Sequence, residues 1–187
     1  MFTWRQLKKN KAISEDYFNN IRSLITNKLL IKTIIDNNIT LYFCFHHQLK
    51  INKLNFNYNV NVKFIKENEI SNVLSKVSLV ITDFSSIIFD MIYRKMPFII
   101  YIPDLNDTYN KDNYNENYQR VIKEMVNGKI YFKNKFFNLK KVIKKIIFYI
   151  NNNFKLEKSL EIFYRSFNFK KNNGTISFIN YLNNLKI

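Results

Sequence analysis

Short apolar runs alternate with amphipathic segments along most of the chain. Continuous runs of strand length lie at residues 40–45, 60–65, 77–82 and 97–102. Between the later runs, residues 69–76 and 85–94 space their apolar side chains as a helix does. Buried strands that alternate with helices indicate an α/β fold, with a parallel sheet covered by helices on both faces.

Two longer amphipathic helices flank this alternation. The first is predicted from an N-cap at Ser14 to about Asn37. Its apolar side chains recur at near-helical spacing and are Ile21, Leu24, Ile25, Leu29, Ile31 and Ile35. The second is predicted from an N-cap at Asn138 to about Asn152 and carries lysines opposite its apolar face. Such a basic helix can lie on anionic lipid, but it is also ordinary in a domain core with its lysines in water.

The remaining segments are polar or short. The sequence predicts loops at residues 48–59 and 104–117, a short strand at 129–132, and one or two helices within 155–187, broken near 172–174. No internal repeat or linker divides the sequence, so residues 1–187 are predicted to form a single domain.

The composition excludes several classes of protein. Hydrophobic residues make up 47% of the 187, which is enough for a folded core and argues against a disordered tail. The single cysteine, Cys44, excludes an internal disulfide framework and a cysteine-based zinc site. No apolar run approaches the roughly 18 residues that span a bilayer. Residues 1–9 lack the apolar core of a signal peptide.

The chain is strongly basic. Its 30 Lys and Arg residues against 14 Asp and Glu give a formal net charge of +16. Such a charge favours a polyanionic partner: nucleic acid, an anionic membrane or a phosphate-rich substrate. Part of the excess reflects a composition rich in Asn, Ile, Lys, Phe and Tyr, which AT-rich coding DNA produces.

The most informative segment is the passage from strand to helix at residues 80–90. A buried strand ends at Thr82, a tight polar turn follows, and a helix begins at once. Free backbone N–H groups at a helix start attract anions, and Ser85 and Ser86 add hydroxyl donors at that point. Ligands of open parallel sheets lie outside the carboxyl ends of the strands. The residues therefore suggest a phosphate site, although either serine would also serve as an ordinary helix cap.

Three motifs resemble the CDP-glycerol glycerophosphotransferase family. Residues 81–90 read Ile-Thr-Asp-Phe-Ser-Ser-Ile-Ile-Phe-Asp and are followed by Arg-Lys-Met-Pro-Phe-Ile-Ile-Tyr at 94–101 and by Asp104. The C-terminal domain of the family has Thr-Asp-Tyr-Ser-Ser, apolar residues, Phe-Asp, Arg/Lys-Pro and an apolar strand ending in Tyr. Thr-Trp-Arg at 3–5 resembles the family's Pro-Thr-Trp-Arg, and Phe-His-His at 45–47 resembles its strand-end His-Pro.

The resemblance implies both a fold and an activity. Enzymes of this family make teichoic acids and related capsule polymers, and they have the B-type glycosyltransferase fold, with two Rossmann-like domains facing a cleft. This chain would be the C-terminal, donor-binding half. A hydroxyl of the growing polymer would attack the phosphorus next to glycerol, and CMP would leave. No metal or other cofactor is implied, because donors on the protein hold the phosphates.

The resemblance also implies roles for substrate-binding residues. Ser85 and Ser86 would hold the pyrophosphate, and Arg5 would add positive charge through its planar fork of donors. Asp90 would lie near the ribose hydroxyls. A structural alternative pairs Asp90 with Arg94, four residues further along the helix.

A histidine is implied on the catalytic side of the cleft. His46 or His47 follows a strand, where imidazole can donate to a phosphate or move a proton near neutral pH. Register favours His46, because His47 stands where the family often has Pro; the alternative is an ordinary surface histidine. Thr82 and Asp83 are assigned to the structure of the turn, since Asp accepts from nearby backbone N–H groups.

The chain departs from the family pattern at several places. It has no counterpart of the acceptor-binding N-terminal domain, and it begins on the Thr-Trp-Arg motif without the central strand that precedes it. We expect the lost strand to leave an apolar slot in the sheet. Asn-rich residues 109–118 and Phe178 stand where the family has arginines. These departures predict a truncated protein or half of a split enzyme, inactive alone.

The implied partners follow from the same resemblance. They are CDP-glycerol or a similar CDP-linked donor, a polymer acceptor, a partner chain carrying the N-terminal domain, and peripheral contact with an anionic membrane. The implied location is the cytoplasm, at the inner face of the bacterial cell membrane.

Three alternatives stay open. A transferase of the same fold could use CDP-ribitol or a nucleotide sugar, because a Ser-Ser turn contacts phosphates and not the base. A basic nucleic-acid-binding module could stack bases on the aromatics, but the sequence has no recognisable nucleic-acid motif and its aromatics lie mainly in apolar runs. The last alternative is a scaffold or decayed fragment without a ligand.

Overall fold

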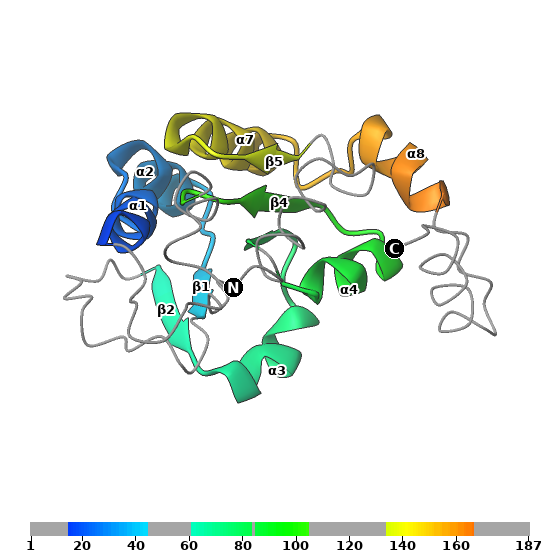
Figure 1. The fold of residues 1–187 in the computed structure, drawn as a ribbon, viewed down its shortest axis with the longest axis horizontal. Coiled ribbons are helices and arrows are strands. Elements are labelled where there is room, and N and C mark those ends of the chain that lie inside the picture. The colour runs from blue at the N-terminus through cyan, green and yellow to red at the C-terminus, as the bar shows by residue number, and fades with distance from the viewer. Residues whose placement is uncertain (1–14, 45–60, 84, 105–133, 167–187) are drawn as a thin grey trace, which may run out of the picture.

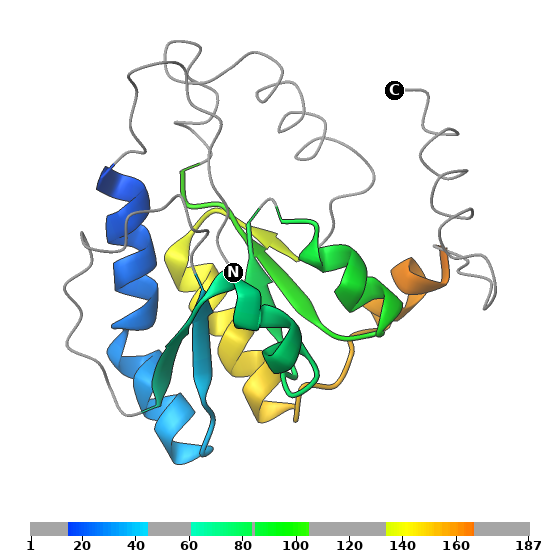
Figure 2. The same ribbon diagram turned by 90° about the horizontal axis from the view of Figure 1, so that it is seen from below.

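The computed structural model describes residues 15–44, 61–83, 85–104 and 134–166 (Figures 1 and 2). The elements in chain order are α1 (Glu15–Ile25), α2 (Lys28–Asp36), β1 (Leu41–Cys44), β2 (Val62–Ile65), the short 3₁₀ helix η2 (Glu67–Glu69), α3 (Ile70–Leu74), β3 (Val80–Thr82), α4 (Ile87–Tyr93), β4 (Phe98–Tyr101), β5 (Lys135–Phe136), α7 (Leu139–Asn151) and α8 (Lys158–Ser166). The loops predicted at 48–59 and beyond Asp104, the strand at 129–132 and the break at 172–174 lie outside these residues.

The described strands are parallel, as the sequence predicts. β1 pairs with β2 in one sheet, and β3, β4 and β5 pair in that order in a second. Helices α1, α2 and α7 lie on one side of the strands, and α3 and α4 lie on the other (Figure 1). The α/β fold class, Rossmann-like with helices on both faces, is confirmed.

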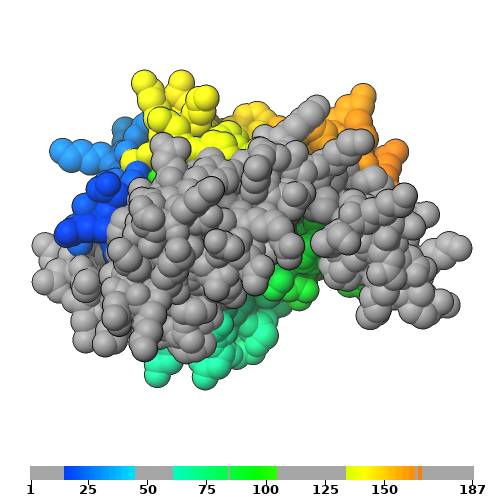
Figure 3. All heavy atoms as spheres, in the orientation of Figure 1, coloured from blue at the N-terminus to red at the C-terminus, as the bar shows by residue number. Residues whose placement is uncertain are grey.

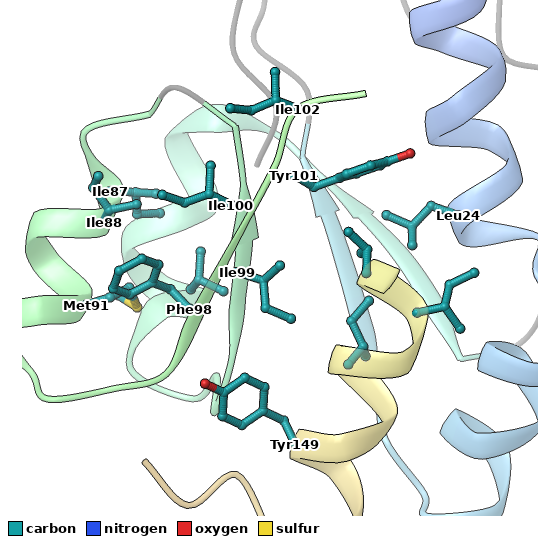
Figure 4. Packing of buried hydrophobic residues seen from close by; sticks show 14 of the residues in the cluster. Leu24, Ile87, Ile88, Met91, Phe98, Ile99, Ile100, Tyr101, Ile102 and Tyr149 are labelled. Atoms are coloured by element: carbon teal, nitrogen blue, oxygen red, sulfur yellow. The ribbon is translucent and has the colours of Figure 1, made fainter. Parts of the chain in front are cut away.

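β4 is the most deeply buried strand. All four of its residues are 0% exposed. Their side chains alternate between the two faces: Phe98 and Ile100 point toward α4, and Ile99 and Tyr101 point toward α7 and α1 (Figure 4). A strand buried on both faces needs a continuous apolar run, which explains why the sequence pattern located β4 so clearly.

The single helix predicted from Ser14 to Asn37 is wrong, because the structure has two helices there. α1 ends at Ile25, and α2 begins after Asn27, whose side-chain oxygen accepts a hydrogen bond from the backbone N–H of Leu30 at 3.1 Å. Because of the break, α2 buries different side chains from those that the single-helix prediction placed in the core. Leu30 and Ile34 enter the core, whereas the predicted Leu29 and Ile35 are 60% and 48% exposed.

The helix predicted after Asn138 is confirmed as α7. The side chain of Asn138 accepts a hydrogen bond from the backbone N–H of Lys141 at 3.3 Å, as an N-cap does. Most of the predicted apolar face is buried, and the other face is exposed (Figure 3, yellow). The exposed lysines are Lys140, Lys141 and Lys144. No helix within the described residues is both long and apolar enough to cross a membrane.

One sheet was predicted, whereas the strands that the structure describes form two. An apolar cavity of about 450 Å³ lies between β1 and β3, with β2 and β4 on the outer sides of these strands. β3 is also shorter than predicted, since residues 77–79 precede the strand and line the cavity.

A buried polar network joins β5, α7 and the segment after α7. The side-chain amide of Asn134 donates to the Tyr149 hydroxyl at 2.8 Å and to the carbonyl of Phe98 at 3.2 Å. The Tyr149 hydroxyl donates to the carboxylate of Glu157 at 2.6 Å, and Lys145 forms an ion pair with the same carboxylate at 2.5 Å. Burial of Glu157 acts to raise its pKa, but Lys145 and Tyr149 outweigh that effect and hold the pKa below its usual value.

Replacing Tyr149 with Phe is expected to destabilise the fold. The variant removes the hydroxyl and leaves Asn134 and Glu157 without a shared partner, which costs about 1–3 kcal/mol. Urea denaturation would measure the loss as a lower midpoint. Tyr42→Phe is the matched control, because the half-buried Tyr42 hydroxyl makes no hydrogen bond with the described residues. Equal midpoints for the two variants would contradict a stabilising role for the network.

Candidate functional site

Buried polar residues gather where β3 and β4 end. Thr82 and Asp83 at the end of β3 are 0% exposed, Ser85 is 6% exposed, and Asp104 after β4 is 4% exposed. Polar side chains rarely occupy a core without hydrogen-bonding partners. Because the two strands are parallel neighbours, their carboxyl ends bring these residues to one edge of the sheet, which is the usual position of a ligand site in this class of fold.

Two tyrosine hydroxyls connect this edge to α1. The hydroxyl of Tyr17 in α1 donates to the carboxylate of Asp83 at 3.4 Å. The hydroxyl of Tyr101 at the end of β4 donates to the side-chain oxygen of Asn20 in α1 at 3.5 Å. α1 is thereby held against the turn after β3. Sequence reasoning missed Tyr17 and Asn20; the available signal was a polar pair on the face of α1 that also carries Ile21 and Leu24.

The Tyr101 hydroxyl stays protonated at neutral pH. Burial, together with the nearby carboxylate of Asp104, raises the pKa of Tyr101 to about 12. Tyr101 can therefore act as a hydrogen-bond donor but not as a base near neutral pH.

The two serines of the turn have different environments. Ser85 is buried, and its hydroxyl oxygen accepts a hydrogen bond from the backbone N–H of Ile87 at 3.3 Å. Ser86 is exposed, and its hydroxyl makes no hydrogen bond with the described part of the chain. Ser85 therefore helps to form the turn and the helix start, whereas the Ser86 hydroxyl is accessible to a ligand.

The predicted free backbone N–H groups at the helix start are mostly occupied, so that prediction is wrong for the first turn of α4. Besides Ile87, the N–H of Ile88 is bonded to the Ser85 carbonyl at 3.5 Å, and the N–H of Phe89 is bonded to the Ser86 carbonyl at 2.9 Å. The physical reason is that the turn is tight enough for Ser85 and Ser86 to satisfy these donors themselves. The Ser86 hydroxyl is therefore an accessible donor for an anion at this point.

Asp90 lies on the exposed surface of α4. The alternative of an ion pair with Arg94 is not observed, because the Arg94 guanidinium donates to the carbonyl of Leu74 at 3.1 Å. Only the backbones of the two residues are bonded to each other, at 3.0 Å. Among the described residues Asp90 has no side-chain partner, so its predicted contact with ribose stays a prediction.

The other predicted site residues, Arg5, His46 and His47, lie outside the described residues. Cys44 is buried, and burial raises the pKa of its thiol, which keeps it in the unreactive protonated form. Within residues 15–44, 61–83, 85–104 and 134–166, no group of His, Cys, Asp and Glu side chains is placed so that it could hold a metal ion.

Comparison with known proteins identifies the class. The family model of CDP-glycerol:poly(glycerophosphate) glycerophosphotransferase matches residues 1–177. The chain belongs to this family. No solved structure matches the chain.

A relative of known role extends the comparison. The minor teichoic acid biosynthesis protein GgaB of Bacillus subtilis (strain 168) is 28% identical over 148 residues. The match covers 79% of this chain and 15% of that relative, so the chain spans a small part of the relative's length.

The two serines are expected to differ in their contribution to stability. Ser85→Ala removes the acceptor for Ile87 at a helix start and is expected to cost about 1 kcal/mol. Ser86→Ala is expected to stay within about 0.5 kcal/mol of the wild type, as exposed substitutions do. Chemical denaturation of the two variants in parallel would measure this difference. A large loss in Ser86→Ala, with none in Ser85→Ala, would contradict the roles that their hydrogen bonds indicate.

Proposed function

We propose that this chain binds a CDP-linked donor, CDP-glycerol, at the carboxyl edge of β3 and β4 for glycerophosphate transfer. The observation that carries the proposal is the exposed Ser86 hydroxyl at the start of α4, beside the buried Asp83–Tyr17 contact. The turn is fixed by the core, so the backbone that carries this hydroxyl is in place before a ligand arrives. Membership of the glycerophosphotransferase family supports a phosphate-bearing donor as that ligand.

Each residue of the turn has a distinct role in this proposal. Ser86 donates a hydrogen bond to the pyrophosphate. Ser85 shapes the turn and lies close enough in sequence to add a second contact. Thr82 and Asp83 hold the turn against the sheet and α1. A preformed site lowers the entropy cost of ordering side chains around the ligand.

The reaction proposed for the complete site is phosphoryl transfer. A hydroxyl oxygen of the polymer forms a bond to the phosphorus next to glycerol, the bond from that phosphorus to the bridging oxygen breaks, and CMP leaves with the electron pair. Arg5 supplies positive charge for the phosphates, and Asp90 contacts the ribose. His46, or His47 beside it, takes the proton of the attacking hydroxyl or stabilises the phosphate. Transfer needs donor and acceptor held in one geometry, so turnover requires the acceptor side of the cleft.

The polymer acceptor and the membrane are proposed as further partners. The relative is a teichoic acid biosynthesis protein, which supports an acceptor of the alditol phosphate polymer class. A partner chain with the acceptor-binding domain would complete a split enzyme. Peripheral contact with the inner face of an anionic membrane is supported by the exposed Lys140, Lys141 and Lys144 of α7.

Binding of CDP-glycerol is expected to raise the unfolding temperature of the purified chain. A ligand at 100 times its dissociation constant stabilises the native state by about 2.7 kcal/mol, which shifts the transition by several degrees in a domain of this size. Ser86→Ala is expected to reduce the shift without changing the transition of the free protein. Lys158→Ala is the control and should keep the full shift, because the exposed Lys158 lies in α8, which contacts Met96 at the amino end of β4, opposite the proposed site.

The same measurement separates the alternatives. A larger shift with CDP-ribitol, UDP-glucose or GDP-mannose than with CDP-glycerol would reassign the donor. A shift with single-stranded DNA that disappears steeply with added salt would favour a nucleic-acid-binding module. A transition that no nucleotide moves would contradict the proposed function.

A further inference from the structure

The cavity between the two sheets has walls that are mostly aliphatic. Ile34 of α2 and Ile150 of α7 line one side of it, and Val73 and Leu74 of α3 line the other. Its volume is about 450 Å³. Sites for small molecules are typically of about 300–1,000 Å³, with apolar walls and a few polar groups. The size and the lining of this cavity therefore fit a small apolar ligand.

Several apolar residues around the cavity are only half-buried. They are found next to both sheets and include Ile39, Leu41, Val77 and Leu79. An apolar side chain that keeps contact with solvent gains free energy in proportion to the area that another apolar group covers. The cavity therefore presents apolar surface that a ligand would cover.

Polar residues collect at one end of the cavity. Asn38 and Thr40 precede β1, and Lys76 and Ser78 precede β3. β1 and β3 run in the same direction (Figure 2), so these residues mark the amino edge of the strands. All four are exposed, and the cavity therefore reaches the molecular surface at this edge. The candidate donor site lies at the opposite, carboxyl edge.

Lys76 sets the charge at this end. It is the only charged residue among the described residues that line the cavity, and its ammonium group forms no ion pair within the described part of the chain. The Ser78 and Thr40 hydroxyls and the Asn38 amide are further hydrogen-bond donors beside it. An apolar interior with a single cation at its mouth is complementary to a molecule that has an apolar chain and an anionic head.

We propose that this cavity binds one long-chain anionic amphiphile of the fatty-acid class, with its carboxylate at Lys76 and its acyl chain between the sheets. A cavity of about 150 Å³ holds one benzene ring, so a volume of about 450 Å³ has room for roughly 18 carbon atoms, which is one acyl chain and not two. The inference goes beyond the donor site and does not depend on which donor the chain binds.

The test measures the binding of saturated fatty acids to the full chain by titration calorimetry, below the concentrations at which they form micelles. The dissociation constant is expected to fall about fourfold for each methylene added between octanoate and dodecanoate, because a buried methylene contributes about 0.8 kcal/mol. Dodecyltrimethylammonium has a long apolar chain and a cationic head. It is expected to bind more weakly than dodecanoate, because its head meets Lys76.

Charge variants test the position of the anionic head. Lys76→Glu is expected to weaken dodecanoate binding by about two- to fivefold, the range for an exposed ion pair. Lys140→Glu makes the same charge change in the first turn of α7, which begins just after β5 at the carboxyl edge, and should bind as the wild type does. Equal weakening in both variants would indicate a general attraction to a chain of net charge +16 and would overturn the proposal.

A variant that fills the cavity tests the position of the acyl chain. Leu79→Trp adds bulk to the cavity wall and is expected to weaken dodecanoate binding by about tenfold or more, because the indole occupies volume that the chain needs. Leu29→Trp is the matched control, since Leu29 is 60% exposed and does not line the cavity. Urea denaturation would show whether each variant folds. If Leu79→Trp does not fold, the chain-length series and the charge variants decide in its place.

Other outcomes overturn the proposal. Absence of saturable binding, or a dissociation constant that does not change with chain length, would exclude an acyl chain in the cavity. Equal loss of binding in folded Leu79→Trp and Leu29→Trp would place the chain elsewhere. Binding to phosphatidylglycerol vesicles without binding of soluble dodecanoate would assign the lipid contact to the surface of the protein.

Discussion

The burial of β4 on both faces is the constraint on which the described structure depends. Each of its side chains contributes about 1.5–3 kcal/mol when it leaves water, but its backbone must then be paired on both edges. β3 and β5 supply that pairing, and α4 and α7 supply the two apolar faces. At the start of β4, the side-chain amide of Asn134 donates to the carbonyl of Phe98, so this buried backbone group is also paired.

This arrangement explains why the candidate site lies where it does. Parallel strands bring their carboxyl ends to one edge, and the chain must turn there at once to place α4 back over β4. That turn contains Asp83, Ser85 and Ser86, and the contact of Asp83 with Tyr17 ties it to α1. The turn is therefore held rigid by the core. The exposed Ser86 is expected to add little to stability, and its hydroxyl is available to a ligand.

The sequence predicts the elements whose pattern is set locally and misses those set by contacts elsewhere. The run at 97–102 located β4, and Asn138 located the start of α7, because burial and capping leave clear signals. The break at Asn27 was missed because apolar residues recur on both sides of it, although their faces differ. β5, whose ladder to β4 involves only Lys135 and Phe136, has too few paired residues for a pattern.

In the candidate site, too, residues with a local signal were predicted and those defined by contacts between elements were missed. Resemblance selected the turn at 82–86, but it could not separate the buried Ser85 from the exposed Ser86, because both are serines beside a helix start. It also could not find Tyr17 and Asn20, whose relation to the turn exists only after α1 packs on the sheet.

The most direct test of the central claim is a crystal structure of the chain with CDP-glycerol. The account predicts the pyrophosphate within hydrogen-bond distance of the Ser86 hydroxyl, with the turn and α1 unchanged from the free protein. A nucleotide bound at another edge of the sheets, or a turn that must rearrange to admit it, would contradict the account.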